Sequence, residues 1–159
     1  MSRDDEADKV WRLIEKVGFC MMSTLEGDDI RARPMSAHVD RQRGVIAFLT
    51  DADSHKDDDV ARNPNVGLSF ADVSGQKYVS VSGRAAVSND RGRIRELWST
   101  WAKAWWDGPD DPAVRLLEVT PKDAHYWDSP GTLVSTVKML AAAVSDSRPA
   151  VGESGTVRL

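Results

Sequence analysis

The sequence has little cysteine, little histidine and no long apolar run. Cys20 is the only cysteine in 159 residues, so no disulfide forms within the chain. No apolar segment approaches the roughly 18 residues of a membrane-spanning helix, and the acidic N-terminus does not begin like a secretory signal. His38 and His55 have no second imidazole or thiolate at metal-ligand spacing, which argues against a metal site. These absences predict a cytoplasmic protein that does not enter a membrane.

The chain also lacks an excess of positive charge. Its formal net charge is -4, so no sequence-wide positive field attracts nucleic acid or an anionic membrane. Basic and aromatic residues are not interleaved along one strand, as single-strand nucleic-acid binders require. We therefore expect no nucleic-acid partner. Small molecules, or a second copy of this chain, are the expected partners.

What the chain does contain is enough apolar sequence for one core. With 41% hydrophobic residues in 159, a single domain is expected over residues 1–144. From residue 145 to residue 159 the composition turns to Ser, Asp, Pro, Gly and Glu, which predicts a disordered tail.

Hydrophobic periodicity predicts the order of the elements. Apolar residues at helical spacing indicate an amphipathic helix over residues 4–17, with Ser2 as its cap and Gly18 as its end. Alternating segments predict strands at 19–25, 30–39, 45–50, 66–71, 77–88, 114–120 and from 124 onward. The connections are short, which suits antiparallel neighbours. The predicted fold is mainly β: a six-stranded antiparallel Greek-key barrel with flanking helices, in which Gly83 is a possible bulge.

Two later segments read as helices. Asn89 is the expected cap of a helix whose apolar residues repeat every three or four positions. That stripe consists of Ile94, Leu97, Trp98, Trp101 and Trp105. Core packing is one interpretation of the stripe; a partner subunit, or a planar ring beside Trp105 or Trp106, is the other. A second helix is expected after the Ser129–Pro130 pair, with Val137 and Leu140 on its apolar side.

The strand over residues 30–39 carries two arginines. Period-two alternation places Arg31, Arg33 and Met35 on one face, where two guanidinium groups could grip a phosphate. Ordinary surface arginines on a half-exposed strand are the competing interpretation. Pro34 cannot donate to a sheet ladder, so this strand lies at an edge, at a bulge or beside a ligand.

A further cationic feature lies where residues 54–56 begin a short helix. Helix starts leave N–H groups unpaired and favour anions, and Ser54 with Asp57 has the spacing of a capping box. Lys56 in the first turn opposes the helix dipole by about 0.3–1 kcal/mol unless an anion is near. The following aspartates could supply that anion. A single phosphate shared by Lys56 and Arg33 explains both cationic features together.

Strand order and motifs together resemble the pyridoxamine phosphate oxidase-like split-barrel flavoproteins, especially their bacterial general stress protein branch. The resemblance covers roughly residues 8–135. Its motifs are Arg31–Ser36, Phe48–Thr50 leading to Ser54–Lys56, Asn63–Phe70, and Thr120–Pro121 with Tyr126–Asp128.

The resemblance implies FMN at the interface of a homodimer. It implies that Arg33 holds the phosphate, that residues 34–36 and 49–50 border the ring system and its ribityl chain, and that residues 54–56 complete the phosphate cradle. A tryptophan, Trp105 or Trp106, would cover the ring. The candidate cofactor-binding residues are Arg31, Arg33, Pro34, Met35, Ser36, Leu49, Thr50, Ser54, His55, Lys56 and Trp106.

The sequence departs from the true oxidases of this family in ways that bear on activity. Those enzymes use a lysine where this chain has His38, and a C-terminal arginine–histidine motif that it lacks. Vitamin B6 oxidation is therefore not expected. The expected function is that of an FMN-binding general-stress-type flavoprotein, with electron transfer between flavin and a small substrate or nicotinamide nucleotide left open. The alternatives are a non-catalytic flavin carrier or sensor and a deazaflavin-binding reductase; no catalytic side chain is assigned.

Overall fold

The computed structural model describes residues 2–53, 55–129, 132–145 and 152–159, with the backbone alone for residues 55–57 and 132–136. The helices are α1 (Arg3–Val17), α2 (His55–Arg62), α3 (Arg91–Leu97) and α4 (Thr132–Ser145), with a short 3-10 helix η1 (Thr100–Ala104). The strands are β1 (Phe19–Glu26), β2 (Asp29–Ser36), β3 (His38–Asp40), β4 (Val45–Asp51), β5 (Asn65–Asp72), β6 (Lys77–Ser88), β7 (Val114–Asp128) and β8 (Glu153–Arg158).

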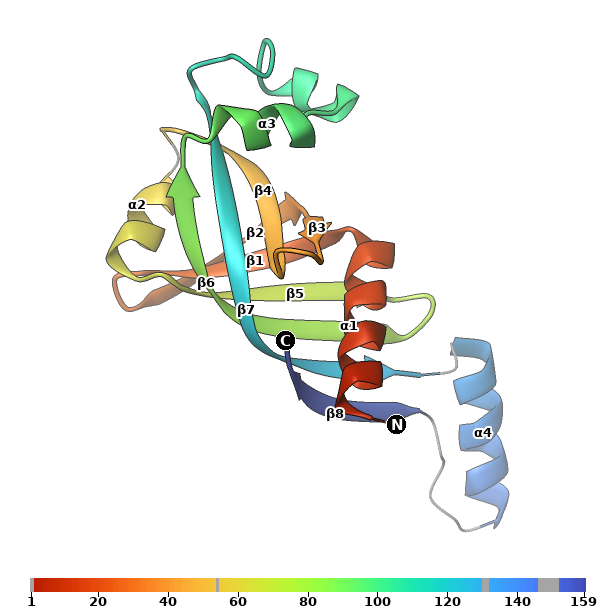
Figure 1. The fold of residues 1–159 in the computed structure, drawn as a ribbon. Helices are drawn as coiled ribbons and strands as arrows, with labels where there is room; N and C mark the ends of the chain where they lie inside the picture. The colour runs from red at the N-terminus through yellow and green to blue at the C-terminus, as the bar shows by residue number, and fades with distance from the viewer. Residues whose placement is uncertain (1, 54, 130–131, 146–151) are drawn as a thin grey trace.

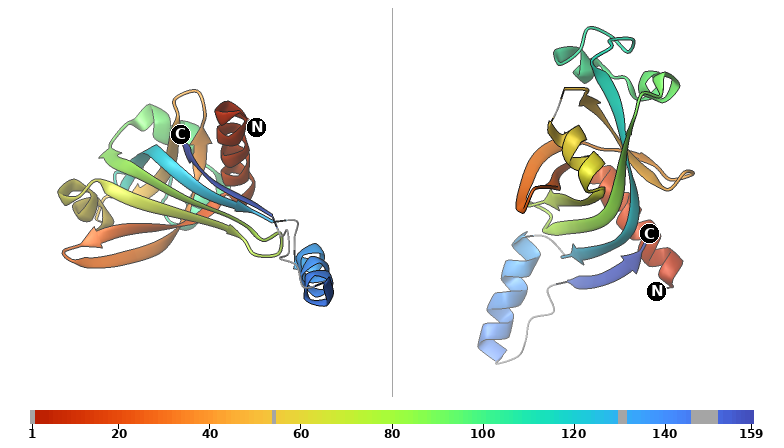
Figure 2. Two further views of the ribbon diagram at one scale, coloured as in Figure 1. Left: turned by 90° about the horizontal axis from the view of Figure 1, so that it is seen from below. Right: turned by 90° about the vertical axis from the view of Figure 1, so that its left-hand side faces the viewer.

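All the strands belong to one antiparallel sheet that coils on itself (Figures 1 and 2). The strand order is β2-β1-β5-β6-β7-β4-β3, and β2 comes back into contact with β4. One edge of the long strand β7 is shared, because its first half pairs with β4 and its last half pairs with β8. The predicted mainly-β antiparallel split-barrel fold is confirmed, and the described residues form eight strands where about six were expected.

The bend of the sheet depends on a glycine. The pairing of β6 with β7 shifts register between Ser82 and Gly83, which is the bulge expected there. A Cβ on Gly83 would lie 2.7 Å from the Thr120 carbonyl oxygen and from Val119 Cγ1. Only glycine allows the two strands to approach this closely at the bulge.

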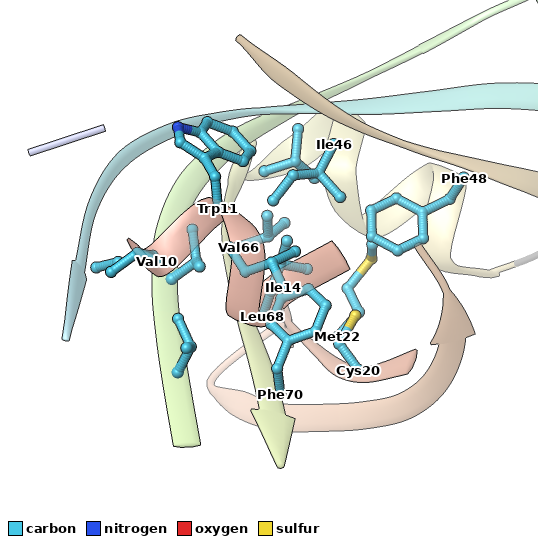
Figure 3. Close-up of a cluster of buried hydrophobic side chains, with 14 of the residues drawn as sticks. Val10, Trp11, Ile14, Cys20, Met22, Ile46, Phe48, Val66, Leu68 and Phe70 are labelled. Carbon is cyan, nitrogen blue, oxygen red and sulfur yellow. The ribbon is translucent and has the colours of Figure 1, made fainter. Parts of the chain in front are cut away.

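The core lies between α1 and the concave face of the sheet (Figure 3). Val10 and Ile14 of α1 are fully buried against apolar side chains from β1, β4 and β5. Ser2 and Asp5 form the reciprocal capping box at the start of α1, and Gly18 ends it with positive φ. Cys20 of β1 is buried among these residues as a packed apolar side chain with a free thiol.

The tryptophan-rich segment differs from its prediction. The cap of α3 is Asp90, whose carboxylate accepts from the Arg93 amide, and not Asn89. The helix ends at Leu97 because Trp98 is extended, and η1 follows in a new direction. A single helical stripe therefore does not form. Ile94 is buried, whereas Trp101 and Trp105 are 86% and 79% exposed.

Three other boundaries differ. The expected strand 30–39 is divided at Ala37 into β2 and β3, and β7 runs unbroken where two strands were expected. Within the tail expected to be disordered, residues 153–158 form β8: its pairing with β7 and the burial of Val157 supply order that the polar composition does not reveal. Residues 146–151 lie outside the described residues. Among the helices described, none has the length and apolarity to cross a membrane.

Candidate functional site

A pocket of about 530 Å³ opens between β2, β4 and the η1 segment. Its volume is within the range of small-molecule sites. The structure brings to it most of the residues singled out from sequence: Arg33, Pro34, Met35, Ser36, Leu49, Thr50 and Trp106 all line its wall. A larger groove of about 810 Å³ runs over β1, β5, β6 and β7, but its lining has neither an aromatic ring nor any candidate residue.

The strand β2 reaches the pocket because it lies at the edge of the sheet. It pairs only with β1, in a register that sets Pro34 opposite Met21. An edge strand tolerates a proline, as the sequence indicated. Arg33 and Met35 are half-buried, whereas their neighbours Pro34 and Ser36 are more exposed.

The two arginines of β2 have different environments. Arg31 is held outside the pocket by Glu26 at 3.1 Å and Asp29 at 3.5 Å, so its charge is already compensated. Arg33 lines the pocket and donates from Nη1 to the buried Thr24 hydroxyl at 2.7 Å. Within the part of the chain that the structure describes, Arg33 has no acidic partner. A half-buried cation in an apolar pocket attracts an anion strongly, because its surroundings screen it less than water does.

Aromatic side chains form another part of the pocket lining. Phe19, Trp101 and Trp105 border it and are largely exposed, and Trp106 is half-buried against the small cluster around Ile94. The Trp106 indole Nε1 is buried and has no acceptor among the described residues. A buried donor without a partner is unusual, and an acceptor on a bound ligand would satisfy it.

Among the pocket residues that were not candidate cofactor contacts, His38 and Asp51 are the ionisable ones. Burial lowers the pKa of His38, so its imidazole is mostly neutral at pH 7. Asp51 ends β4 and accepts a hydrogen bond from the Asp53 amide at 3.1 Å. Their positions in the sequence could have indicated both residues, because His38 lies two residues after the candidate contact Ser36 and Asp51 directly follows the candidate contact Thr50. Neither had a local motif of its own.

The predicted phosphate cradle is only partly described. Ser54 lies outside the described residues, and His55 and Lys56 are described by backbone alone, at the start of α2. That helix begins four residues after Asp51, so its first residue, His55, lies within about 15 Å of Asp51 in the pocket wall. The convergence of Lys56 with Arg33 on one anion stays a prediction. No group of three or more His, Cys, Asp or Glu residues in the described chain is arranged to hold a metal ion.

An antiparallel split barrel with one uncompensated arginine and an aromatic wall defines a class of small-molecule-binding barrels. Comparison with known proteins identifies the family within this class. Residues 5–150 match the model of a family described as pyridoxamine 5'-phosphate oxidase like. The chain belongs to this family.

Its relatives include stress proteins. General stress protein 26 of Bacillus subtilis strain 168 is 28% identical over 133 residues, which cover 81% of this chain and 93% of that protein. A candidate general stress protein 26 from Jannaschia sp. CCS1 superposes with a TM-score of 0.81 at 29% identity, over 99% of this chain and 100% of the other. The general stress FMN/FAD binding protein of Xanthomonas citri gives a TM-score of 0.69 at 26% identity, over 79% and 89% of the two chains.

Proposed function

We propose that this chain is a cytoplasmic, homodimeric FMN-binding protein of the general stress type, which passes hydride or electrons between its flavin and a small substrate or nicotinamide nucleotide. The observation that carries the proposal is the state of Arg33: a half-buried guanidinium that bonds to no carboxylate among the described residues. The rest of the pocket lining is mainly apolar and aromatic, with His38 and Asp51 as its other ionisable side chains. FMN matches that combination, since it joins a planar ring system to a phosphate near two negative charges at neutral pH.

The residues present fit this cofactor. Arg33 and the N-terminal turn of α2 would hold the phosphate, because unpaired helix N–H groups favour anions. The backbone at residues 34–36, with Leu49 and Thr50, would border the ring system and its side chain. The orphaned Trp106 Nε1 offers a donor to a ring or chain oxygen. When bound, FMN supplies the redox chemistry, while the chain binds it, orients it and limits its contact with water.

The Xanthomonas citri relative supports flavin binding, because that protein is a general stress FMN/FAD binding protein. Support for the homodimer comes from the surface. Phe19, Trp101 and Trp105 expose large apolar areas around the pocket mouth, and patches of that kind mark interfaces. Vitamin B6 oxidation is not part of the proposal, because His38 stands where the oxidases have a lysine, and burial lowers the pKa of its imidazole and so disfavours the charged form.

The purified protein, stripped of any bound cofactor, tests the proposal by titration with FMN, riboflavin and a phosphorylated deazaflavin. FMN binding with a flavin absorption band, much tighter than riboflavin binding, is the expected result. Preference for the deazaflavin would reassign the cofactor. Flavin binding without turnover by NADH or NADPH, with quinone or dye acceptors, would make the protein a carrier or sensor. Failure to bind any of the three would refute the proposal.

A further inference from the structure

The groove of about 810 Å³ over β1, β5, β6 and β7 is a second cavity with a character of its own. It shares no lining residue with the pocket that holds Arg33. In β6 the exposed residues Ser82 and Arg84 alternate with buried ones, so their side chains point away from the core and from α1. The groove therefore lies on the outer face of the sheet.

The groove is positively charged. Among the described residues that line it, Arg84 and Lys122 are the ionisable ones, and neither forms an ion pair or a side-chain hydrogen bond within the described chain. Asp123 follows Lys122 directly but does not line the groove. The whole chain has a net charge of -4, so two uncompensated cations in one hollow make a local positive field on an acidic protein.

The bulge at Gly83 brings the two cations together. Arg84 pairs with Thr120, whereas Gly83 pairs with Pro121 and Ser82 pairs with Asp123. Lys122 is thus the extra residue of β7 at the bulge, and its side chain is exposed on the same face as that of Arg84. Diagonal neighbours on paired strands lie about 7–8 Å apart, a distance that two long side chains span. One anion can therefore contact both cations.

The floor of the groove is low and polar. Gly67 lies between Ser23 of β1 and Ser82 of β6 in the strand register, and all three line the groove. Because Gly67 has no side chain, the sheet is hollowed between the two serines. The serine hydroxyls are hydrogen-bond donors that suit phosphate oxygens.

The other end of the groove is apolar. Leu25 of β1 pairs with Ile30 of β2, both line the groove, and Ile30 is 72% exposed. One strand, β5, separates β1 from β6, so this end lies about 10 Å from the cationic end. A ligand that fills the groove therefore needs an anionic group at one end and an apolar body at the other.

We propose that this groove binds a small phosphate monoester with an apolar body. The phosphate lies between Arg84 and Lys122, since it carries close to two negative charges at neutral pH and a guanidinium grips its oxygens in forked geometry. The body of the ligand lies against Leu25 and Ile30. This site rests neither on the flavin pocket nor on the homodimer.

Amide NMR spectra of the flavin-free full chain, titrated with phenyl phosphate, test the proposal. Each amide reports on its own surroundings, so binding in the groove is read separately from any binding in the pocket. We expect saturable shifts of the Gly67 and Ser82 amides. Shifts confined to the pocket residues Ser36 and Thr50, or no saturable shift in the millimolar range, would overturn the proposal.

Three alanine variants test the cationic end. Arg84→Ala and Lys122→Ala should each raise the dissociation constant measured at the groove amides about 10-fold, because each removes a charged hydrogen-bond donor. Lys16→Ala is the control: it removes the same charge from an exposed position on α1, on the other face of the sheet, and should change affinity less than about twofold. Equal effects of all three would show a response to net charge only and would overturn the site.

Ile30→Ser tests the apolar end without disturbing the core, because Ile30 is exposed. It should weaken binding of phenyl phosphate and leave binding of inorganic phosphate at the groove unchanged, since inorganic phosphate has no apolar body. Unchanged binding of both probes would overturn the apolar contact.

Sedimentation equilibrium of the same samples identifies the competing occupant. A dimeric protein whose groove amides do not respond to phenyl phosphate would show that a second copy covers the groove, and would overturn the ligand site.

Discussion

Replacing Arg33 tests the phosphate assignment most directly, and the chain supplies its own control two residues away. Arg33→Ala removes the pocket guanidinium that has no acidic partner among the described residues. Arg31→Ala removes a guanidinium of the same strand that Glu26 and Asp29 already neutralise outside the pocket. The two variants change net charge equally, so a difference between them reports position and not overall charge.

The expected magnitude follows from the bond that is lost. A hydrogen bond to a charged group contributes about 1.5–3 kcal/mol, which corresponds to roughly a 10- to 150-fold loss of FMN affinity for Arg33→Ala. Riboflavin has no phosphate, so its affinity should change less than about threefold. Arg31→Ala should change FMN affinity less than about threefold, because its charge is solvent-screened and paired. Arg33→Lys keeps the charge but loses the forked donors, so an intermediate loss is expected.

The assay is quenching of flavin fluorescence on titration with protein, at fixed ionic strength. Arg33→Ala also leaves the buried Thr24 hydroxyl without its donor, at a stability cost of about 1 kcal/mol, so thermal unfolding of each variant is recorded alongside. Equal losses of FMN and riboflavin would refute the reasoning. So would an Arg31→Ala effect as large as that of Arg33→Ala.

Three further outcomes are expected. Gly83→Ala should destabilise the fold by about 1–3 kcal/mol, because the added Cβ would lie 2.7 Å from the Thr120 carbonyl oxygen, and the melting temperature should fall by about 2–4 °C per kcal/mol. The control is Gly108→Ala, since nothing lies within 4 Å of a Cβ at that position, and an equal fall in melting temperature for both variants would contradict the close approach at Gly83. Burial lowers the pKa of His38 from 6.5, so the unfolded chain takes up the proton first, and the free energy of unfolding should fall as the pH drops below about 6.5. Chemical denaturation at several pH values should show that the free energy of unfolding depends less steeply on pH in His38→Gln. An unchanged dependence would exclude this histidine as the cause. Burial raises the pKa of Cys20 to about 12, so a maleimide at neutral pH should label it only after unfolding, and rapid labelling of the native protein would show the interior to be open.

Local features of the fold could be predicted from the sequence because neighbouring residues determine them. The cap at Ser2 and Asp5 and the end of α1 at Gly18 depend on contacts within one turn. The bulge at Gly83 could be predicted for a related reason, since a glycine inside a long alternating strand often marks a point where two backbones approach closely. The mainly-β antiparallel class followed from alternation and short connections.

The candidate site was predicted only as a set of residues. The two-residue spacing of Arg31 and Arg33 placed both side chains on one face of the strand, so the alternation gave both arginines the same expected role in phosphate binding. The structure separates them, because acidic neighbours hold Arg31 while the Thr24 hydroxyl holds Arg33 at the pocket. The pairing of β1 with β2 brings Glu26 to Arg31 and Thr24 to Arg33, and the alternation of residues within β2 alone does not show this.

Tertiary structure also decided where the apolar surfaces lie. Helical spacing suggested one tryptophan stripe from α3 onward, but the chain turns at Trp98 and presents Trp101 and Trp105 outward. The strand β8 was missed for the converse reason, since its order comes from pairing with β7 and not from its own polar sequence. The sequence alone determined the mainly-β antiparallel class and the residues at which α1 begins and ends. Only the packing of distant segments decided which side chains share the pocket and which apolar faces are left for a partner, because burial and strand pairing are properties of the whole chain.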